Sequence, residues 1–313
     1  MSFPTVPDST FIELVSENGP HATARKLGVS VRGVCARISR LELKTGKAIP
    51  RPERRSPLPV SVPGRLEFEC KTGCIIVGGD AHFWPGIITT AHRALLKFIK
   101  AEKPKAVVMN GDIFDGARIS RHAAIGWENK PSVIMELEAC QERMGEIEEA
   151  AGKAHKFWPL GNHDSRFESR LAQVAPEYAR VHGVHLSDHF SLWEKCWSVW
   201  VNDDVVIKHR YKGGTHATHN NTVSSGKTMV TNHLHSQKVT EWTDYLGTRW
   251  GVDTGCLAEP FGPQFTDYTE DNPRNHRSGF AVLTFDNYEL LRPEVVRVVR
   301  PGVVDWRGKL WDI

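Results

Sequence analysis

Cys74-Ile75-Ile76-Val77-Gly78-Gly79-Asp80-Ala81-His82 joins an apolar run directly to an aspartate and a histidine, two potential metal ligands. The same arrangement recurs three times along the chain. The further blocks, each after an apolar run, are Gly111-Asp112-Ile113-Phe114-Asp115, Gly161-Asn162-His163-Asp164 and His233-Leu234-His235. Short apolar runs of this kind predict buried strands. We therefore expect carboxylates and imidazoles to gather at strand ends.

The order of the predicted elements indicates the fold class. Strands are predicted at 74–79, 105–110 and 156–160, separated by helices near 89–102 and 132–151, which predicts a parallel sheet with its functional side chains at the carboxyl ends of the strands. Apolar runs at 196–201, 205–208, 229–232, 248–253 and 279–285 predict a second, more antiparallel sheet, and 292–300 a terminal strand. Residues 67–313 should thus form a four-layer α/β/β/α sandwich.

The blocks point to a pair of cations. Aspartate, asparagine and histidine are suited to divalent metals, and two such ions roughly 3.5–4 Å apart can clamp the attacking and leaving oxygens of a phosphoryl displacement. Over residues 74 to about 285 the order D-x-H, G-D-x-x-D, G-N-H-D and H-x-H resembles the calcineurin-like metallophosphoesterase family. The resemblance implies a metal-dependent phosphoesterase that holds two divalent ions, with Mn²⁺ favoured and Fe, Zn or Ni as alternatives. The layout also resembles members of this family encoded by tailed phages and prophages.

The resemblance further implies a role for each position. One cation would be bound by Asp80, His82 and His235, and the other by Asn162, His233 and one further histidine, with Asp112 bridging both. Gly111 should let the chain turn tightly toward the metals. His163 would be the catalytic imidazole that faces the phosphate and the leaving oxygen, and Asp115 would orient it.

Three positions near these blocks need separate treatment. The predicted strand 205–208 runs into His209, which we expect to be the remaining metal ligand, with His216 and His219 as alternatives in the next loop. Asn232 stands where the family has glycine, and we expect it to take up a positive φ. Arg166 either binds the substrate phosphate or lies on a solvated helix face.

The N-terminal part differs from the rest of the chain in its predicted secondary structure. Residues 1–47 predict a small all-α domain, and the prolines and arginines of 48–66 predict an extended linker. Helices are predicted after Asp8 or Ser9 up to Gly19, over 21–27, and after a Ser30 cap. The turn at Gly28 resembles that of helix-turn-helix domains.

Charge is concentrated in this part of the chain. Residues 21–55 hold ten Lys or Arg and two Glu, a net of +8, whereas the remainder carries −5. The exposed side of the third helix is expected to present Arg32, Arg37, Arg40 and Lys44 to DNA. The alternative is a solvated bundle face that mediates oligomerisation or partner docking.

Composition narrows the remaining choices. The longest apolar stretches are strand-sized, so no membrane span is expected, and neither an export signal nor a disulfide spacing of the six cysteines is visible, which favours the cytoplasm. We expect a phosphodiesterase with nucleic acid, preferably DNA, as its partner, most simply a nuclease. A phosphomonoesterase or cyclic-nucleotide phosphodiesterase recruited by the N-terminal domain is the alternative, and a DNA-binding regulator with a degenerate centre is a third.

Overall fold

The structure is a computed structural model that describes residues 6–50, 62–120, 130–179, 181–265 and 274–313. The chain divides into two compact units, Met1–Val60 and Ser61–Ile313. Most of the expected linker, residues 51–61, lies outside the described residues. Among the described residues, no helix is both long and apolar enough to cross a membrane.

The first unit contains two helices, α1 (Asp8–Leu27) and α2 (Val31–Thr45). α1 kinks where Gly19 adopts a φ of 71°, directly before Pro20, so the first two predicted helices form one bent element. Ser30 caps α2 as expected, because its hydroxyl accepts the backbone N–H of Gly33 at 3.1 Å. The apolar core of the unit comprises Phe11, Val15, Ala24, Val34, Ile38, Leu41 and Ile49.

The cations of α2 do not all face outward. Arg32, Arg40 and Lys44 are exposed. The side chain of Arg37 is only 17% exposed; it donates to the Val6 carbonyl at 2.5 Å and to Asp8 Oδ1 at 2.8 Å, and its guanidinium lies 4.4 Å from the Phe11 ring. The expectation that Arg37 lines the exposed side was wrong, because the residue falls on the same helical stripe as the core positions 34, 38 and 41.

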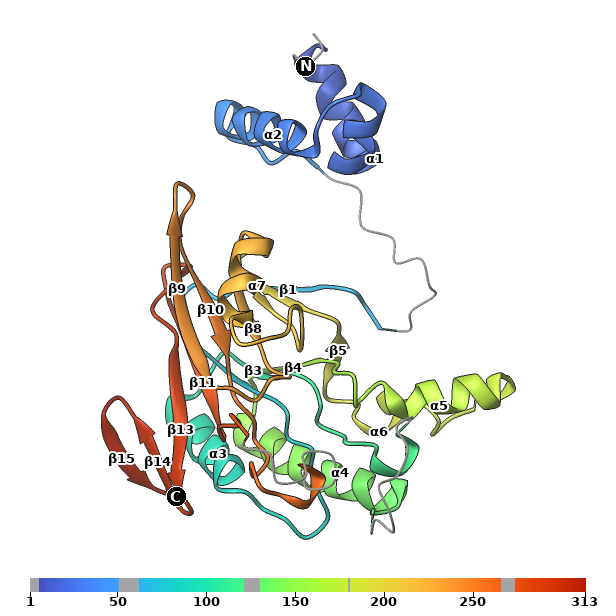
Figure 1. The fold of residues 1–313 in the computed structure, drawn as a ribbon, viewed down its shortest axis with the longest axis vertical. Coiled ribbons are helices and arrows are strands. Elements are labelled where there is room, and N and C mark those ends of the chain that lie inside the picture. Colours follow the sequence, from blue (N-terminus) through green and yellow to red (C-terminus); the bar gives the residue numbers. More distant parts are fainter. Residues whose placement is uncertain (1–5, 51–61, 121–129, 180, 266–273) are drawn as a thin grey trace. The chain divides into compact units, whose positions relative to one another are not determined.

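In the second unit, one large sheet carries the predicted β-α-β-α-β start (Figure 1). Its order is β15-β14-β13-β11-β2-β3-β4-β5, with β12 (Glu289–Leu290) paired to β11. The parallel strands are β2 (Gly73–Gly78), β3 (Ala106–Met109), β4 (His155–Pro159) and β5 (Glu194–Cys196). The antiparallel strands are β11 (Gly279–Asp286), β13 (Glu294–Arg300), β14 (Val303–Trp306) and β15 (Lys309–Asp312).

The smaller sheet has the order β1-β6-β7-β8-β10-β9. Its strands are β1 (Leu66–Phe68), β6 (Val199–Val201), β7 (Val205–Ile207), β8 (Thr228–Thr231), β9 (Lys238–Asp244) and β10 (Gly247–Asp253). It is not mainly antiparallel, since β1–β6, β7–β8 and β8–β10 pair in parallel and only β6–β7 and β9–β10 pair antiparallel.

Two predicted strands of the smaller sheet lie elsewhere. The run 196–201 divides between β5 of the large sheet and β6 of the small one. The run 279–285 forms β11, which pairs with β2 inside the large sheet. Residues 279–283 are all buried, as a strand enclosed between neighbours on both sides requires.

Helices cover both outer faces. α3 (Thr90–Glu102) and α4 (Val133–Ala151) share one apolar core with the large sheet, and a second core fills the space between the two sheets. α7 (Ala217–Ser225) packs on β8, β9 and β10 of the small sheet. Shorter helices are α5 (Arg166–Val174), α6 (Leu186–His189) and the 3₁₀ turns Ala117–Ile119 and Pro176–Tyr178. The predicted α/β/β/α sandwich is confirmed.

Candidate metal centre

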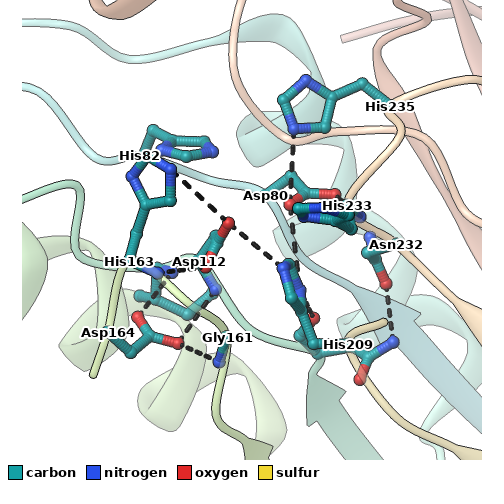
Figure 2. A network of polar contacts seen from close by, with 12 residues as sticks. Asp80, His82, Asp112, Gly161, His163, Asp164, His209, Asn232, His233 and His235 are labelled. Atoms are coloured by element: carbon teal, nitrogen blue, oxygen red, sulfur yellow. Dashed lines mark hydrogen bonds and ion pairs between the residues drawn. The ribbon is translucent and has the colours of Figure 1, made fainter. Parts of the chain in front are cut away.

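The chain brings the four sequence blocks together where the two sheets meet. From the large sheet, Asp80 and His82 follow β2, Asp112 follows β3 and Asn162 follows β4. From the small sheet, His209 follows β7, and His233 and His235 follow β8. Figure 2 shows Asp112 between the imidazoles of His163 and His209, with Asp80, His233 and His235 beside them.

The backbone at this cluster is unusual. Five expected ligands adopt a left-handed backbone with φ between 39° and 73°: Asp80, His82, Asp112, His233 and His235. Non-glycine residues rarely occupy this region, at a cost of about 1 kcal/mol or more each. Gly111, with φ 84°, gives the tight turn that was expected before Asp112, and a side chain there would collide with the His209 ring. The fold therefore accepts local strain in order to aim the ligands inward.

The ligand atoms form two groups that fit a pair of cations. Asp80, His82 and His235 offer atoms within 4.8 Å of one another, and so do Asp112, His209 and His233. Four buried atoms at the centre make no hydrogen bond of good geometry in the described part of the chain: Asp80 Oδ1, His82 Nε2, Asn162 Oδ1 and His209 Nε2. Two of them have only ion-pair contacts, His209 Nε2 with Asp112 at 3.1 Å and Asp80 Oδ1 with His235 at 3.4 Å. Leaving such groups unsatisfied is costly. Divalent cations would satisfy all four, so the residues fit the metals that the family implies.

Outer hydrogen bonds fix the imidazoles. Asp115 Oδ1 accepts from Nδ1 of His82 at 2.7 Å and from Nδ1 of His163 at 2.9 Å, and the Asn110 carbonyl accepts from Nδ1 of His209 at 2.9 Å. Each bond uses Nδ1 of the ring and so fixes the orientation of Nε2, the nitrogen that could serve a ligand or substrate. Asp115 thus orients a metal ligand as well as the expected catalytic histidine.

Asp164 anchors Asp112, the expected bridging residue. Its Oδ2 accepts from the backbone N–H of Asp112 at 2.9 Å, from the N–H of Gly161 at 2.8 Å and from Nε1 of Trp158 at 3.1 Å. Its Oδ1 accepts from the next two backbone N–H groups after Asp112, at 2.9 and 3.0 Å. One carboxylate therefore holds the second block against the third.

The protonation states at the centre would let a cation take the place of a proton. Although burial disfavours their charged forms, the pairing of Asp112 with His209 at 3.1 Å holds the pKa of Asp112 well below its usual range and raises the pKa of His209 to about 9. Burial and the neighbouring charge of His209 lower the pKa of His233 to about 4. In the metal-free protein one imidazolium stands next to one neutral imidazole, and a cation would replace its proton.

His163, the expected catalytic imidazole, lies at the rim of this cluster. His163 Nε2 is 4.0 Å from Asp112 Oδ2, and its backbone N–H donates to Asp112 Oδ1 at 2.8 Å. Arg166 donates to the Asp115 carbonyl at 2.9 Å, and its Nη2 lies 3.0 Å from His163 Nε2. Arg166 therefore lies at the centre and not on a detached helix face.

Other predictions near the site are resolved as follows. His209 joins the cluster, whereas His216 is exposed at the start of α7 and His219 packs against Trp242. Asn232 does not adopt the expected positive φ, which falls on His233 and His235 instead. The Asn232 side chain is buried and links Asn110 to Gly255 through hydrogen bonds of 2.7 and 2.9 Å.

Sequence reasoning missed several supporting residues. Three of the hydrogen bonds of Asp164, and the bond from His82 to Asp115, connect distant blocks, and no local pattern indicates them. His276 has no ligand-like spacing in the sequence, yet its Nδ1 lies 3.4 Å from Nδ1 of His235. Asp253 at the end of β10 is buried, and burial raises its pKa to about 6. A carboxylate directly after an apolar run was the available signal for Asp253.

Comparisons with known proteins give a family match and several similar solved structures. The family model described as calcineurin-like phosphoesterase matches residues 75–249. Similar solved structures include Vps29 complexed with zinc from Entamoeba histolytica (15% identity, 76% of this chain and 98% of that chain, TM-score 0.41) and a protein serine/threonine phosphatase from Saccharomyces cerevisiae (12%, 76% and 85%, 0.36). A dimetal phosphatase from Danio rerio is a third (12%, 73% and 96%, 0.37).

Among the curated proteins, none matches significantly. The family model covers more than half of the chain and includes ligand positions from all four blocks. This chain therefore belongs to the calcineurin-like phosphoesterase family and is a metal-dependent hydrolase.

Proposed function

We propose that the protein is a phosphodiesterase that cleaves DNA at its metal centre and is recruited to DNA by its N-terminal helical unit. One observation carries this proposal: a unit with exposed Arg32, Arg40 and Lys44 on α2 belongs to the same chain as a cluster of Asp and His side chains that could hold metal ions. Lys and Arg on an exposed helix face suit contact with nucleic-acid phosphates.

The residues of the centre have distinct tasks in this reaction. Asp112 and the six other ligands would hold two divalent ions, for which we propose Mn²⁺. Such ions polarise the phosphate and activate water as the nucleophile. His163, oriented by Asp115, would hold a proton for the departing oxygen, and Arg166 would contact a non-bridging phosphate oxygen.

We further propose that this is a phage- or prophage-type enzyme that works in a cytoplasm. The resemblance of its layout to such phosphoesterases supports the first point. The six cysteines, all present as free thiols in the structure, support the second.

An activity panel tests the proposed function. Protein loaded with Mn²⁺ should cleave bis-p-nitrophenyl phosphate and DNA, and Asp112→Ala should abolish both activities. Hydrolysis of p-nitrophenyl phosphate alone would favour the alternative of a phosphomonoesterase, and cleavage of cyclic nucleotides alone would favour a cyclic-nucleotide phosphodiesterase.

The recruiting role needs its own variant. Replacing Arg32, Arg40 and Lys44 together by alanine should weaken DNA binding and flatten its salt dependence. A matched control removes three exposed arginines of the second unit, Arg292, Arg297 and Arg300. Equal losses in the two triple variants would contradict a specific role of the N-terminal unit.

A further inference from the structure

The segment after β7 has a charge pattern that the metal centre alone does not explain. Residues 205–240 contain five Lys or Arg and no Asp or Glu. Two of these cations are already occupied: Lys227 pairs with Asp204 at 3.2 Å, and Lys238 donates to the Thr215 carbonyl at 3.0 Å. The other three, Lys208, Arg210 and Lys212, surround the metal ligand His209 in the sequence.

These three cations form a strip with an exposed aromatic ring. Tyr211 is 48% exposed, and the ammonium groups of Lys208 and Lys212 lie 5.5 and 5.9 Å from its ring centroid. Arg210 and Lys212 are exposed, and Lys208 is half-buried. We call Lys208, Arg210, Tyr211 and Lys212 the basic strip.

The loop that carries the basic strip is held at several points. The buried Asn221 of α7 accepts the backbone N–H of Lys212 at 2.9 Å, and Lys238 holds the carbonyl of Thr215. At the other end, His209 is fixed by the Asn110 carbonyl. The basic strip is therefore preorganised. Two of its residues, Lys208 and Arg210, directly flank the expected metal ligand His209.

We propose that the basic strip binds single-stranded DNA that leads into the metal centre, a proposal that rests on the proposed nuclease function. The three cations would contact successive backbone phosphates, and Tyr211 would stack on a base. A duplex base is already stacked on both faces, so an exposed ring suits an unpaired base. Positive grooves that carry aromatic rings bind single strands in this manner.

Tyr211→Ala is the central test, and the chain offers a matched control. Tyr288 is 49% exposed with Lys71 Nζ 6.0 Å from its ring, and it lies beyond the end of β11 that pairs with the start of β2, away from the ligand edge. Because Tyr211→Ala removes the stacking ring, it should weaken the Kd for a 20-nucleotide oligothymidylate about tenfold. Tyr211→Phe should retain most of the affinity.

The charges give a second readout. Arg210→Ala combined with Lys212→Ala should reduce the slope of log affinity against log salt by about 1.4, because each single-strand phosphate contact contributes about 0.7. In turnover, Tyr211→Ala should lower the ratio of kcat/KM on single-stranded DNA to that on bis-p-nitrophenyl phosphate about tenfold. Circular dichroism checks that the variants are folded.

The outcomes separate this inference from the proposed function. If the unaltered protein cleaves DNA but Tyr211→Ala matches Tyr288→Ala in Kd and in the ratio, the basic strip is not a DNA site. If no DNA is cleaved, the proposed function fails, and the Kd and salt-slope measurements still decide whether the strip binds single strands. Equal weakening of duplex and single-strand binding by Tyr211→Ala would overturn the assignment to unpaired bases.

Discussion

Replacing Asp164 by asparagine should lower the free energy of unfolding of the second unit, Ser61–Ile313, by about 4 kcal/mol. The carboxylate accepts five hydrogen bonds, two at Oδ1 and three at Oδ2. The amide of asparagine has one oxygen and one NH₂ group. In the better of its two orientations the oxygen takes the place of Oδ2 and still accepts from three donors. The NH₂ group then faces the backbone N–H groups of Ile113 and Phe114, which lose their acceptor. Each buried donor left unsatisfied costs about 1–3 kcal/mol, which gives about 2–6 kcal/mol for the pair.

Urea unfolding followed by tryptophan fluorescence measures this loss. All ten tryptophans lie between residues 61 and 313, so the signal reports the unit that contains Asp164. A loss of this size is a large part of the 5–15 kcal/mol typical of a domain. The variant should also bind Mn²⁺ more weakly, because the backbone of Asp112 loses its anchor.

Asp286→Asn is the matched control, since that side chain is exposed at the end of β11. It should change the free energy of unfolding by less than about 0.5 kcal/mol. If Asp164→Asn changed the free energy of unfolding by less than 1 kcal/mol, the reasoning that this carboxylate holds the two blocks together would be refuted.

Three further predictions follow from the contacts. Asp115→Asn weakens the shared acceptor of two imidazoles and should lower kcat or Mn²⁺ affinity about 10–100-fold; unchanged kinetics would contradict its orienting role. Arg37→Ala should lower the thermal stability of the N-terminal unit, whereas Arg40→Ala should not; calorimetry would contradict this by showing equal shifts. Because the proton of His209, with a pKa of about 9, must leave before a cation binds, Mn²⁺ affinity should rise about tenfold per pH unit from pH 7 to 9 and then level off; calorimetric titration giving a constant affinity would refute this.

Local sequence was sufficient to place the expected ligands. An apolar run ending in a carboxylate or imidazole defines both a strand and a side chain at its end, and this is why Asp80, Asp112 and His233 could be placed before the structure was known. The same logic selected His209 over two later histidines, because only His209 directly follows a strand.

Features set by distant contacts could not be predicted in this way. Nothing within residues 279–285 indicates that β11 pairs with β2, which lies far earlier in the chain. Arg37 has the charge of a DNA contact but occupies a helical position on the same side as the core residues. Its position decides the outcome, and the side chain is largely buried and paired with Asp8. Asn232 was expected to supply a special backbone conformation, and it supplies side-chain hydrogen bonds between the two sheets instead.

Metal stoichiometry tests the central claim most directly. Protein saturated with Mn²⁺ and then freed of unbound ions should contain two Mn²⁺ per chain by elemental analysis, and anomalous diffraction should place one beside Asp80 and one beside His233. Asp112→Ala should lose both ions on the same treatment. Fewer than one ion per chain, or equal uptake by Asp112→Ala, would contradict a two-cation centre bridged by this residue.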